Sequence, residues 1–508
     1  TIEILKTNPA AVELVDKAIL DLAKESIEAS RQRVFIVGDP EAILVVEYYG
    51  ESQDELAQKM DNLDAILKER DLGYASVRAT TATEQANVWG VRKNGLGLLM
   101  GMKGYTKPAP FVEDTAVSPE YLPEYISRFR QIVADHDTTA TYYAHASVGT
   151  LHIRPLINLK STEDIDKMRR IAEDILDLVL EFGGAMSAEH GDGLVRSEWN
   201  EKVFGSKLYG AFGELKAIFD PKNIMNPGKI VGGQKMTENL RFGPDYETEQ
   251  INTFFDFSAD GGFARSVELC NGVGACRKKL TGTMCPSYMA TLDEEHSTRG
   301  RANMLRAALS GQLDDEGFTS HRLYEALDLC LECKGCKSEC PSNVDMAKMK
   351  YEFLAHYYDK HGLPLRNRLF GHIASVSKVA AAFAPLSNMI MNSDINKWAL
   401  DYFIGIDKRR NMPKFAHETF EAWFYARPKP TVEHDASTVV FYPDTFVNYN
   451  EPALGIATVE VLEKAGYRVI LAEPRRCCGR PFISKGMLKE ARAAAAFNIE
   501  HLSVYAER

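Results

Sequence analysis

Four cysteines in one short segment constrain this chain more than any other feature of its sequence. Cys330, Cys333, Cys336 and Cys340 follow the spacing C-x2-C-x2-C-x3-C, and a proline comes directly after the last of them. Three thiolates on so tight a loop can ligate three irons of a cubane, while the fourth turns away toward another cluster. A structural zinc needs only four ligands, usually in two separated pairs. The spacing therefore predicts at least one 4Fe–4S cluster.

A second, less complete set of cysteines lies upstream of this motif. Cys270 and Cys276 frame Val273, which stands where a second cysteine would be expected, and Cys285 precedes a proline. Cys285 is a candidate fourth ligand of the downstream cluster, which leaves Cys270, Cys276 and Cys340 for a second site. That site would hold a three-iron cluster, or a four-iron cluster with a non-cysteine ligand. Alternatively it is empty and Cys340 completes the first cluster.

The placement of the nine cysteines also bears on the compartment. None precedes Cys270, and seven lie between Cys270 and Cys340, whereas a secreted disulfide protein spreads them through its domains. We therefore expect a reducing, cytoplasmic setting.

The net charge of −11 argues against nucleic acid as a partner. No run of about 18 apolar residues is present, so we predict no transmembrane segment, and any membrane association would be peripheral, at the inner face.

The last two cysteines are adjacent. Cys477 and Cys478 precede a glycine, near the end of a strand–helix–strand pattern that begins at Thr438. This pattern predicts a βαβ unit. Vicinal cysteines favour cluster ligation or thiol redox chemistry, although no third ligand is visible. The alternative is one buried and one exposed thiol without a shared function.

Residues 1–235 show an α/β pattern that contains no cysteine. The strand-like runs are 33–37, 42–49 and 140–144, and the helical patterns are 52–70, 119–136 and 161–182. Long helices between strands predict a sheet with helices packed on one face.

This region also carries candidate catalytic groups. His145 and His152 lie on either side of a glycine, where the neighbouring residues predict strand, turn and strand. Such a turn can bring two imidazoles toward one point, and Glu189 and His190 lie in another glycine-rich segment. His145, His152 and Glu189 are candidate ligands of a catalytic divalent metal, Zn or Mn, with His190 as general base. The alternative is a set of separate, hydrogen-bonded loop histidines.

Two further features of this region are less specific. Arg92 can form a bidentate pair with a substrate carboxylate, although a surface arginine is the simpler interpretation. The acidic pair Glu113 and Asp114 is interpreted as a polar site at a strand end.

Together these segments resemble known protein families. Residues 1–232 resemble the C-terminal domain of FAD-linked oxidases, which include D-lactate dehydrogenase, glycolate oxidase and D-2-hydroxyglutarate dehydrogenase. The motifs that carry this resemblance are Trp89–Lys93, His145-x6-His152, Ala188–Gly193 and Phe219–Lys229. Residues 263–360 resemble the iron–sulfur module fused behind that oxidase. Residues 438–508 resemble the first part of the CCG cysteine-rich domain found in glycerol-3-phosphate dehydrogenase and heterodisulfide reductase.

The resemblance implies a two-layer, ferredoxin-like α+β fold for the first domain. It implies a metal at His145, His152 and Glu189, a base at His190 and a carboxylate anchor at Arg92. FAD would take a hydride from C2 of a D-2-hydroxy acid of the D-lactate, glycolate or D-2-hydroxyglutarate class. Electrons would leave through a 4Fe–4S cluster to a quinone, a cytochrome or an electron-transfer protein.

The family's FAD-binding domain precedes this module, and the sequence shows no trace of it. We therefore expect this fragment to be inactive without that domain.

The whole chain is thus predicted to be a multidomain α+β protein. Its parts are an FAD-oxidase C-terminal domain at 1–235, a linker at 236–262, a helical 4Fe–4S ferredoxin-type domain at 263–362, a helical connector at 363–432 and a truncated α/β CCG domain at 433–508. The alternative function is that of a non-catalytic iron–sulfur subunit that transfers electrons and docks to a separate flavoprotein.

Overall fold

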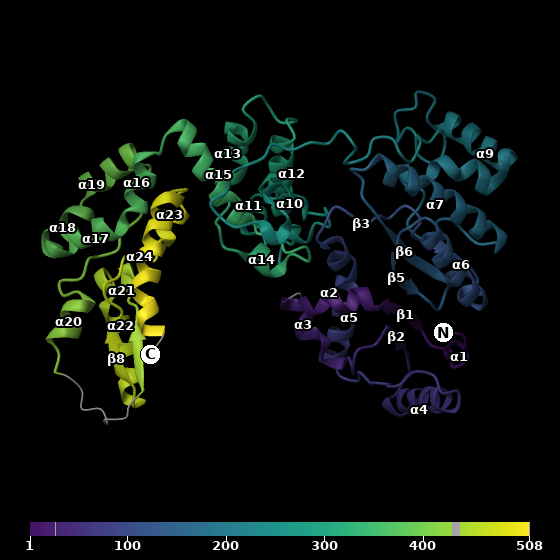
Figure 1. Ribbon diagram of the computed structural model, residues 1–508, viewed down its shortest axis with the longest axis horizontal. Helices are drawn as coiled ribbons and strands as arrows, with labels where there is room; N and C mark the ends of the chain where they lie inside the picture. Colours follow the sequence, from purple (N-terminus) through teal and green to yellow (C-terminus); the bar gives the residue numbers. More distant parts are fainter. Residues whose placement is uncertain (26, 429–436, 507–508) are drawn as a thin grey trace. The chain divides into compact units, whose positions relative to one another are not determined.

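The computed structural model describes every residue except Ser26, 429–436 and 507–508 (Figure 1). The chain forms two compact units. The first unit comprises Thr1–Gln250, Phe257–Gln312 and Lys334–Asp345, and the second comprises Ile251–Asp256, Leu313–Cys333 and Met346–Arg508. The predicted boundary between connector and CCG domain, at residues 432 and 433, lies outside the described residues. The other domain boundaries inferred from the sequence remain predictions.

The first unit is built around an antiparallel sheet. Its strands are β1 (Ala11–Asp16), β2 (Ala42–Glu47), β3 (Lys107–Pro108), β4 (Thr115–Ala116), β5 (Ala140–His145) and β6 (Thr150–Ile157). The order is β2-β1-β5-β6-β3, and β4 also pairs with β6. The predicted strands at 42–49 and 140–144 are present as β2 and β5, and the predicted strand–turn–strand is the β5–β6 hairpin. The strand predicted at 33–37 is wrong, because Arg33–Phe35 form a 3-10 turn, η1.

Helices surround this sheet and continue into the cysteine-containing part of the unit. They are α1 (Ile2–Leu5), α2 (Lys17–Glu25), α3 (Ile27–Gln32), α4 (Gln53–Glu69), α5 (Ala82–Met100), α6 (Leu122–Asp135), α7 (Thr162–Glu181), α8 (Gly193–Arg196), α9 (Asn200–Phe219), α10 (Phe263–Glu268), α11 (Pro286–Thr291), α12 (Thr298–Leu309) and α14 (Gly335–Glu339). Short 3-10 turns are η2 (Pro119–Tyr121), η3 (Ser197–Trp199), η4 (Ser258–Asp260), η5 (Ala275–Arg277) and η6 (Glu294–His296). The three helices predicted from the sequence are present as α4, α6 and α7. The hydroxyl of Ser161 caps α7 by accepting the N–H of Asp164.

The apolar side chains of these helices form separate cores on the two faces of the sheet. On one face α6 and α7 bury residues such as Phe129 against Ile153 of β6. On the other face Val91 of α5 packs with Val15 of β1 and Tyr143 of β5, and α2 completes this cluster. Side chains alternate between the faces of a strand, so each strand serves both cores. The predicted helical layer is therefore joined by a second one, formed by α2 and α5.

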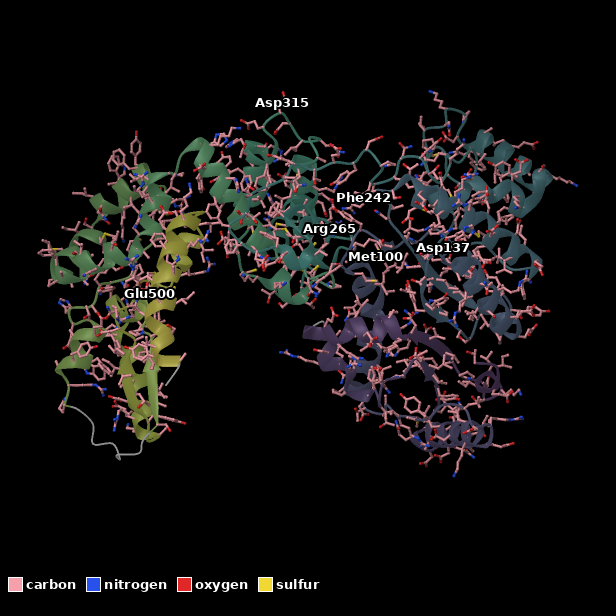
Figure 2. All side chains as sticks on the ribbon, in the orientation of Figure 1. Met100, Asp137, Phe242, Arg265, Asp315 and Glu500 are labelled. Atoms are coloured by element: carbon pink, nitrogen blue, oxygen red, sulfur yellow. The ribbon has the colours of Figure 1, made fainter. Side chains whose placement is uncertain are left out.

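Helix α5 also contacts the cysteine-containing part of the first unit. A Cβ atom added at Gly97 would lie 2.3 Å from the Cβ of Pro341, the residue after Cys340, so the two backbones approach closely here. Lys160 pairs with Glu268 at 2.8 Å and lies 5.2 Å from the ring centroid of Phe242. Figure 2 labels Phe242 in this region, together with Arg265 on α10 and Met100 at the end of α5.

Among its described residues, the second unit is helical apart from one pair of parallel strands, β7 (Thr438–Phe441) and β8 (Arg468–Leu471). Its helices are α13 (His321–Asp328), α15 (Met346–His361), α16 (Leu365–Gly371), α17 (Ile373–Ala382), α18 (Ala384–Met391), α19 (Asp394–Ala399), α20 (Phe420–Ala426), α21 (Thr445–Tyr449), α22 (Pro452–Lys464), α23 (Arg480–Ile483) and α24 (Leu488–Ala506), with a short 3-10 turn η7 (Gly317–Thr319) and a π-helix η8 (Leu400–Ile404). Helix α22 connects β7 to β8, so the predicted βαβ unit is present. Its core includes Phe420, Val459 and Leu471.

The length and composition of the helices bear on whether the chain could cross a membrane. Among the described residues, no single helix is both long and apolar enough to cross a membrane. Helices α17 and α18 reach the length and apolar composition of a membrane span only when they are taken together, and the chain bends by 115° at the break between them.

Candidate functional site

Three neighbouring strands present polar side chains on the same face of the sheet. Glu13 of β1 pairs with His145 of β5, and Tyr143 of β5 pairs with His152 of β6. Because side chains alternate along a strand, Arg154 shares this face with His152. These are the closest cross-strand positions, so the register alone brings five polar or aromatic side chains together. The face is the one that α2 and α5 cover.

Two further groups, Glu189 and His190, come from a loop that Asp114 holds in place. The buried carboxylate of Asp114 accepts the N–H groups of Glu189 at 3.1 Å and His190 at 2.9 Å, and the hydroxyl of Ser187 at 2.8 Å. Burial acts to raise the pKa of Asp114, but these hydrogen bonds bring it below its usual range. Asp114 therefore remains a carboxylate that fixes the backbone of the loop.

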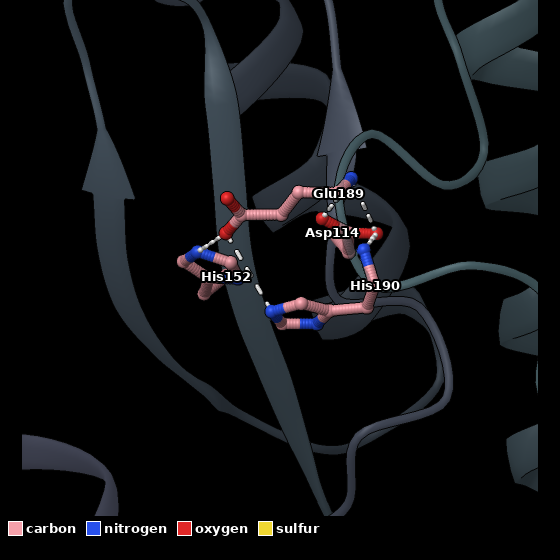
Figure 3. Close-up of side chains that lie close together, drawn as sticks. All are labelled: Asp114, His152, Glu189 and His190. Atoms are coloured by element: carbon pink, nitrogen blue, oxygen red, sulfur yellow. Dashed lines mark hydrogen bonds and ion pairs between the residues drawn. The ribbon is translucent and has the colours of Figure 1, made fainter.

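Three imidazoles converge on one oxygen of Glu189, and Figure 3 shows two of them, His152 and His190, beside Glu189 and Asp114. The Nε2 atoms of His145, His152 and His190 lie 3.1, 3.2 and 3.5 Å from Oε1 of Glu189. The ring of His152 lies in the middle, stacked between Tyr143 at 4.7 Å and His190 at 5.0 Å between ring centroids. All four convergent residues were predicted from the sequence, and the structure brings them together.

The His145 arm of the site, as we call His145, Glu13 and Arg92, begins on β5. Nδ1 of His145 lies 2.7 Å from Oε1 of Glu13. Arg92 of α5 donates to the other oxygen of Glu13 from Nε at 3.0 Å and from Nη2 at 2.7 Å. The hydrogen bond with Glu13 raises the pKa of His145.

The His190 arm consists of His190, Glu113 and Arg154 and repeats this chemistry on the other side of His152. Nδ1 of His190 lies 3.2 Å from Oε1 of Glu113, and Arg154 donates to the other oxygen of Glu113. Glu113 and Arg154 are both buried, whereas the side chain of His190 is 41% exposed. The two arms thus place an Arg–Glu pair behind each outer histidine.

The central histidine differs from both outer ones. Burial, followed by the charges of His145, His190 and Arg92, lowers the pKa of His152 to about 3. His152 is therefore neutral near neutral pH, and it can offer one lone pair. Within the part of the chain that the structure describes, its buried Nδ1 has no hydrogen-bond partner, which leaves Nε2, beside Glu189, as the atom directed into the site.

These residues fit a divalent metal. Neutral imidazole nitrogens and a carboxylate oxygen are ligands that Zn²⁺ and Mn²⁺ accept. Histidine ligands usually donate their second nitrogen to a carboxylate, as Glu13 and Glu113 allow here. Asp114 belongs by distance to the close set of ligand atoms with His152, Glu189 and His190, within 4.8 Å of one another. Its oxygens already accept backbone N–H groups, however, so the metal ligands His145, His152 and Glu189 remain our prediction.

Arg92 lies at the site, but its first partner belongs to the chain itself. Two of the five N–H donors of a guanidinium point to Glu13, so a substrate carboxylate would use the others. Sequence reasoning missed Glu13 and understated Glu113 and Asp114. Glu13 lies within β1, and Glu113 and Asp114 directly precede β4. A carboxylate in such a position does not by itself reveal its distant partners.

Five of the nine cysteines lie in the first unit. Cys270, Cys276, Cys285 and Cys336 are buried there, and Cys340 is partly buried. The thiol of Cys285 lies 3.5 Å from a guanidinium nitrogen of Arg301 and 3.3 Å from the hydroxyl of Ser287.

The other four cysteines lie in the second unit. Cys330 is partly buried, and its carbonyl accepts from Lys350 at 2.8 Å, whereas Cys333 is exposed. Cys477 and Cys478 follow β8, and the hydrogen bond between them lowers the pKa of Cys477. The amide of Asn498 donates to the carbonyl of Cys477 at 3.3 Å.

Three parts of the chain match described domain families. Residues 1–230 match the C-terminal domain of FAD linked oxidases, residues 266–344 a 4Fe-4S dicluster domain and residues 438–507 a cysteine-rich domain, CCG. These matches confirm the predicted order of domains and the multidomain fold class. They support FAD and an iron–sulfur cluster as the cofactors, while the divalent metal remains a prediction.

Curated relatives match either most of this chain or its first part. D-2-hydroxyglutarate dehydrogenase of Pseudomonas putida (strain KT2440) is 29% identical over 98% of this chain and 54% of its own length. D-2-hydroxyglutarate dehydrogenase of Escherichia coli (strain K12) is 27% identical over 91% of this chain and 50% of its own length. D-lactate dehydrogenase of Archaeoglobus fulgidus is 28% identical over 44% of this chain and 46% of its own length. The chain thus spans about half the length of the D-2-hydroxyglutarate dehydrogenases that it matches.

Proposed function

We propose that this chain is part of a dehydrogenase that oxidises a D-2-hydroxy acid to the 2-oxo acid and passes the electrons through an iron–sulfur cluster. The observation that carries the proposal is the convergence of His145, His152 and His190 on Glu189. The names of the relatives favour a substrate of the D-2-hydroxyglutarate class, and D-lactate and glycolate are the smaller alternatives.

His145, His152 and Glu189 would hold the divalent metal, which when bound polarises substrate oxygens as a Lewis acid. His190 is the general base of the proposal. Its Nε2 points into the site, so it can accept the hydroxyl proton of the substrate. Glu113, at Nδ1 of the same ring, would then stabilise the imidazolium that forms. FAD, when bound, supplies the acceptor for the hydride that leaves C2.

The substrate carboxylate would bind at Arg92. The contact with Glu13 orients its guanidinium beside the ring of Tyr143, whose centroid lies 4.9 Å away. A planar, permanently charged fork of this kind recognises carboxylates in preference to neutral groups.

The route for electrons begins beside the same helix. Helix α5 carries Arg92 in its middle and packs on Pro341 next to Cys340, so a cluster at Cys340 would be close to this helix. The final acceptor in this proposal is a quinone, a cytochrome or an electron-transfer protein. We place the protein in the cytoplasm, where it would meet a quinone at the inner face of the membrane.

Flavin reduction in the intact protein tests this proposal. D-2-hydroxyglutarate, D-lactate and glycolate are each mixed anaerobically with the protein, and L-2-hydroxyglutarate serves as the stereochemical control. We expect flavin absorbance to bleach with at least one of the first three compounds and to persist with the control. If no 2-hydroxy acid reduces the flavin, the proposal is wrong.

Substitution of the base separates this proposal from the alternative of a non-catalytic electron-transfer subunit. The enzyme predicts that His190→Ala slows flavin reduction by about 10²- to 10⁴-fold. An electron-transfer subunit predicts that the variant passes electrons from an artificial donor to an acceptor at the unchanged rate, with no substrate oxidation in either form.

A further inference from the structure

Two cysteine loops of this chain have left-handed backbone at the same two positions. In the loop Cys330–Cys336 the residues on either side of Cys333, Glu332 and Lys334, have φ angles of 57° and 59°. In the loop 270–276 the corresponding positions are glycines with φ angles of 83° and 78°. Left-handed φ is uncommon for residues such as glutamate and lysine, so its repetition marks a shared loop geometry.

Val273 therefore occupies in one loop the position that Cys333 occupies in the other. Gly272 and Gly274 flank it, and the side chain of Arg299 fixes this loop by donating to the carbonyl of Gly272 at 2.8 Å. Val273 is 50% exposed. An aliphatic side chain offers no lone pair, so the central ligand position of this loop has no donor to iron.

Three thiols remain around this position, and all lie in the first unit. Burial raises the pKa of Cys270, and the nearby thiols of Cys340 and Cys276 raise it further. The same burial and the thiol of Cys276 act on Cys340, raising its pKa. Contacts of Glu339, the residue before Cys340, agree with this: it pairs with Lys278 at 3.6 Å and accepts the N–H of Thr283 at 2.6 Å. These contacts bring the segment that carries Cys340 beside the segment that follows Cys276, although the two are distant in the sequence.

Each of these sulfurs also meets backbone N–H donors. The N–H of Arg299 lies 3.4 Å from Sγ of Cys276, and the N–H of Gly272 donates to Cys270. N–H groups of residues 342–344 donate to Cys340. Hydrogen bonds of this kind stabilise thiolates and tune the potentials of iron–sulfur clusters.

The spacing of the sulfurs argues against a single metal ion. In the part of the chain described by the structure, the close set of three or more ligand atoms, within 4.8 Å of one another, is formed by Asp114, His152, Glu189 and His190, not by cysteines. Thiolates on one zinc ion would be roughly 3.8 Å apart, as follows from Zn–S bonds of about 2.3 Å. A cluster does not need so close a set, because its irons keep the thiolates farther apart.

We propose that Cys270, Cys276 and Cys340 hold a three-iron, 3Fe–4S cluster, and that the fourth iron is absent because Val273 replaces the cysteine that would bind it. The matched domain family is described as binding 4Fe–4S clusters. This chain departs from that description at position 273, where a valine stands in place of a cysteine ligand. The inference does not depend on hydroxy-acid oxidation, because it concerns the composition of the cluster alone.

The test uses the anaerobically purified protein with its clusters intact, and two readouts that need no substrate. An oxidised three-iron cluster has an odd number of electrons and gives an EPR signal, whereas an oxidised ferredoxin-type 4Fe–4S cluster is silent. We expect the oxidised protein to show this signal, with about seven irons per chain if the Cys330 motif contributes four. About eight irons and a silent oxidised spectrum would overturn the proposal.

The variant Val273→Cys tests the proposal directly, because it restores a cysteine at the position that lacks a ligand. This exposed position tolerates a cysteine, and the loop already has the conformation found around Cys333. We expect the variant to gain about one iron per chain and to lose the EPR signal of the oxidised protein. Val273→Ala is the control and should keep the signal and the lower iron content. If Val273→Cys leaves both readouts unchanged, Val273 does not occupy the missing corner and the proposal is wrong.

Discussion

The His145 arm and the His190 arm use the same three residue types but hold their histidines differently. In the His145 arm both ring nitrogens have close partners, at 2.7 Å from Glu13 and 3.1 Å from Glu189. In the His190 arm the corresponding distances are 3.2 and 3.5 Å, and the ring is more exposed, 41% against 32%. The same three residue types thus hold the imidazole of His145 tightly and the imidazole of His190 more loosely.

This difference in geometry and exposure suggests that the two histidines have different roles. A metal ligand benefits from a ring that is fixed by its second nitrogen. A general base has to accept a proton and release it again, and it needs access to substrate. We therefore assign metal binding to the His145 arm and proton transfer to the His190 arm, and the following experiments test that division.

The largest effects are expected from the two histidines themselves. His145→Ala should reduce bound metal to background, because a ligand of the predicted set is removed. His190→Ala should keep the metal but slow turnover by about 10²- to 10⁴-fold, because the base is lost. Metal analysis and steady-state rates of the intact protein measure both effects.

A histidine outside the site provides the control for these two variants. His136 pairs with Asp174 at 2.7 Å, and His136→Ala should change neither readout. If His190→Ala lost its metal and His145→Ala kept it, the two arms would have exchanged roles.

The carboxylates behind the histidines should produce the next largest effects. Glu13→Gln should weaken metal binding by about 10- to 100-fold, whereas Glu113→Gln should mainly lower turnover and alter its pH profile. Each variant also leaves an arginine without its carboxylate, and Arg154 is the more buried of the two. Thermal unfolding measured in parallel identifies any loss of folded protein.

Glu181→Gln breaks an exposed pair with Arg128 and serves as the matched control, since it should leave metal and turnover unchanged. Equal losses of metal affinity in Glu13→Gln and Glu113→Gln would contradict the division between the arms.

The residues that reach the centre of the site were predictable from the sequence, whereas their supports were not. His145 and His152 lie on one hairpin, so local turn chemistry sufficed to bring them together. Glu13 lies far from His145 along the chain and meets it only through the β1–β5 register. A single sequence does not state which strands are neighbours, so this support remained hidden.

The same limit explains two other differences between prediction and structure. The apolar run at 33–37 has the composition of a strand, yet Arg33–Phe35 form a 3-10 turn packed beside α5, because tertiary contacts override local propensity. Asp114 looked like an ordinary strand-end acid, and its function depends on N–H groups of residues 189 and 190. In contrast, the predicted βαβ unit needed only local pattern and is present.

Asp114 belongs to neither arm, and its substitution should affect both through the loop. Asn at this position keeps one acceptor oxygen and tolerates the positive φ of 75°, so Asp114→Asn isolates the loss of the charged acceptor. We expect the protein to lose about 1–3 kcal/mol of unfolding free energy. Chemical denaturation measures this loss, and Asp174→Asn, at an exposed carboxylate, is the control. An unchanged stability would show that the neutral amide suffices to hold the loop.

The smallest expected effect is the pH dependence of the His145 arm in the metal-free protein. Glu13 raises the pKa of His145 above the ordinary value of 6.5. The resulting stabilisation is fully present below pH 6.5 and is lost as the pH rises through the higher pKa of the folded state. The difference in unfolding free energy between wild type and Glu13→Gln should therefore be largest at low pH and shrink as the pH rises. Denaturant unfolding across this pH range measures it.

The contact between Glu13 and Arg92 adds a constant to this difference, because arginine does not titrate in the same range. The pH-dependent part therefore reports on His145 alone. Glu181→Gln, whose partner is also an arginine, gives the slope expected without a histidine. If the difference in unfolding free energy for Glu13→Gln depended on pH as little as the difference for Glu181→Gln, Glu13 would serve mainly to hold Arg92. The tight hold on His145 would then come from Glu189.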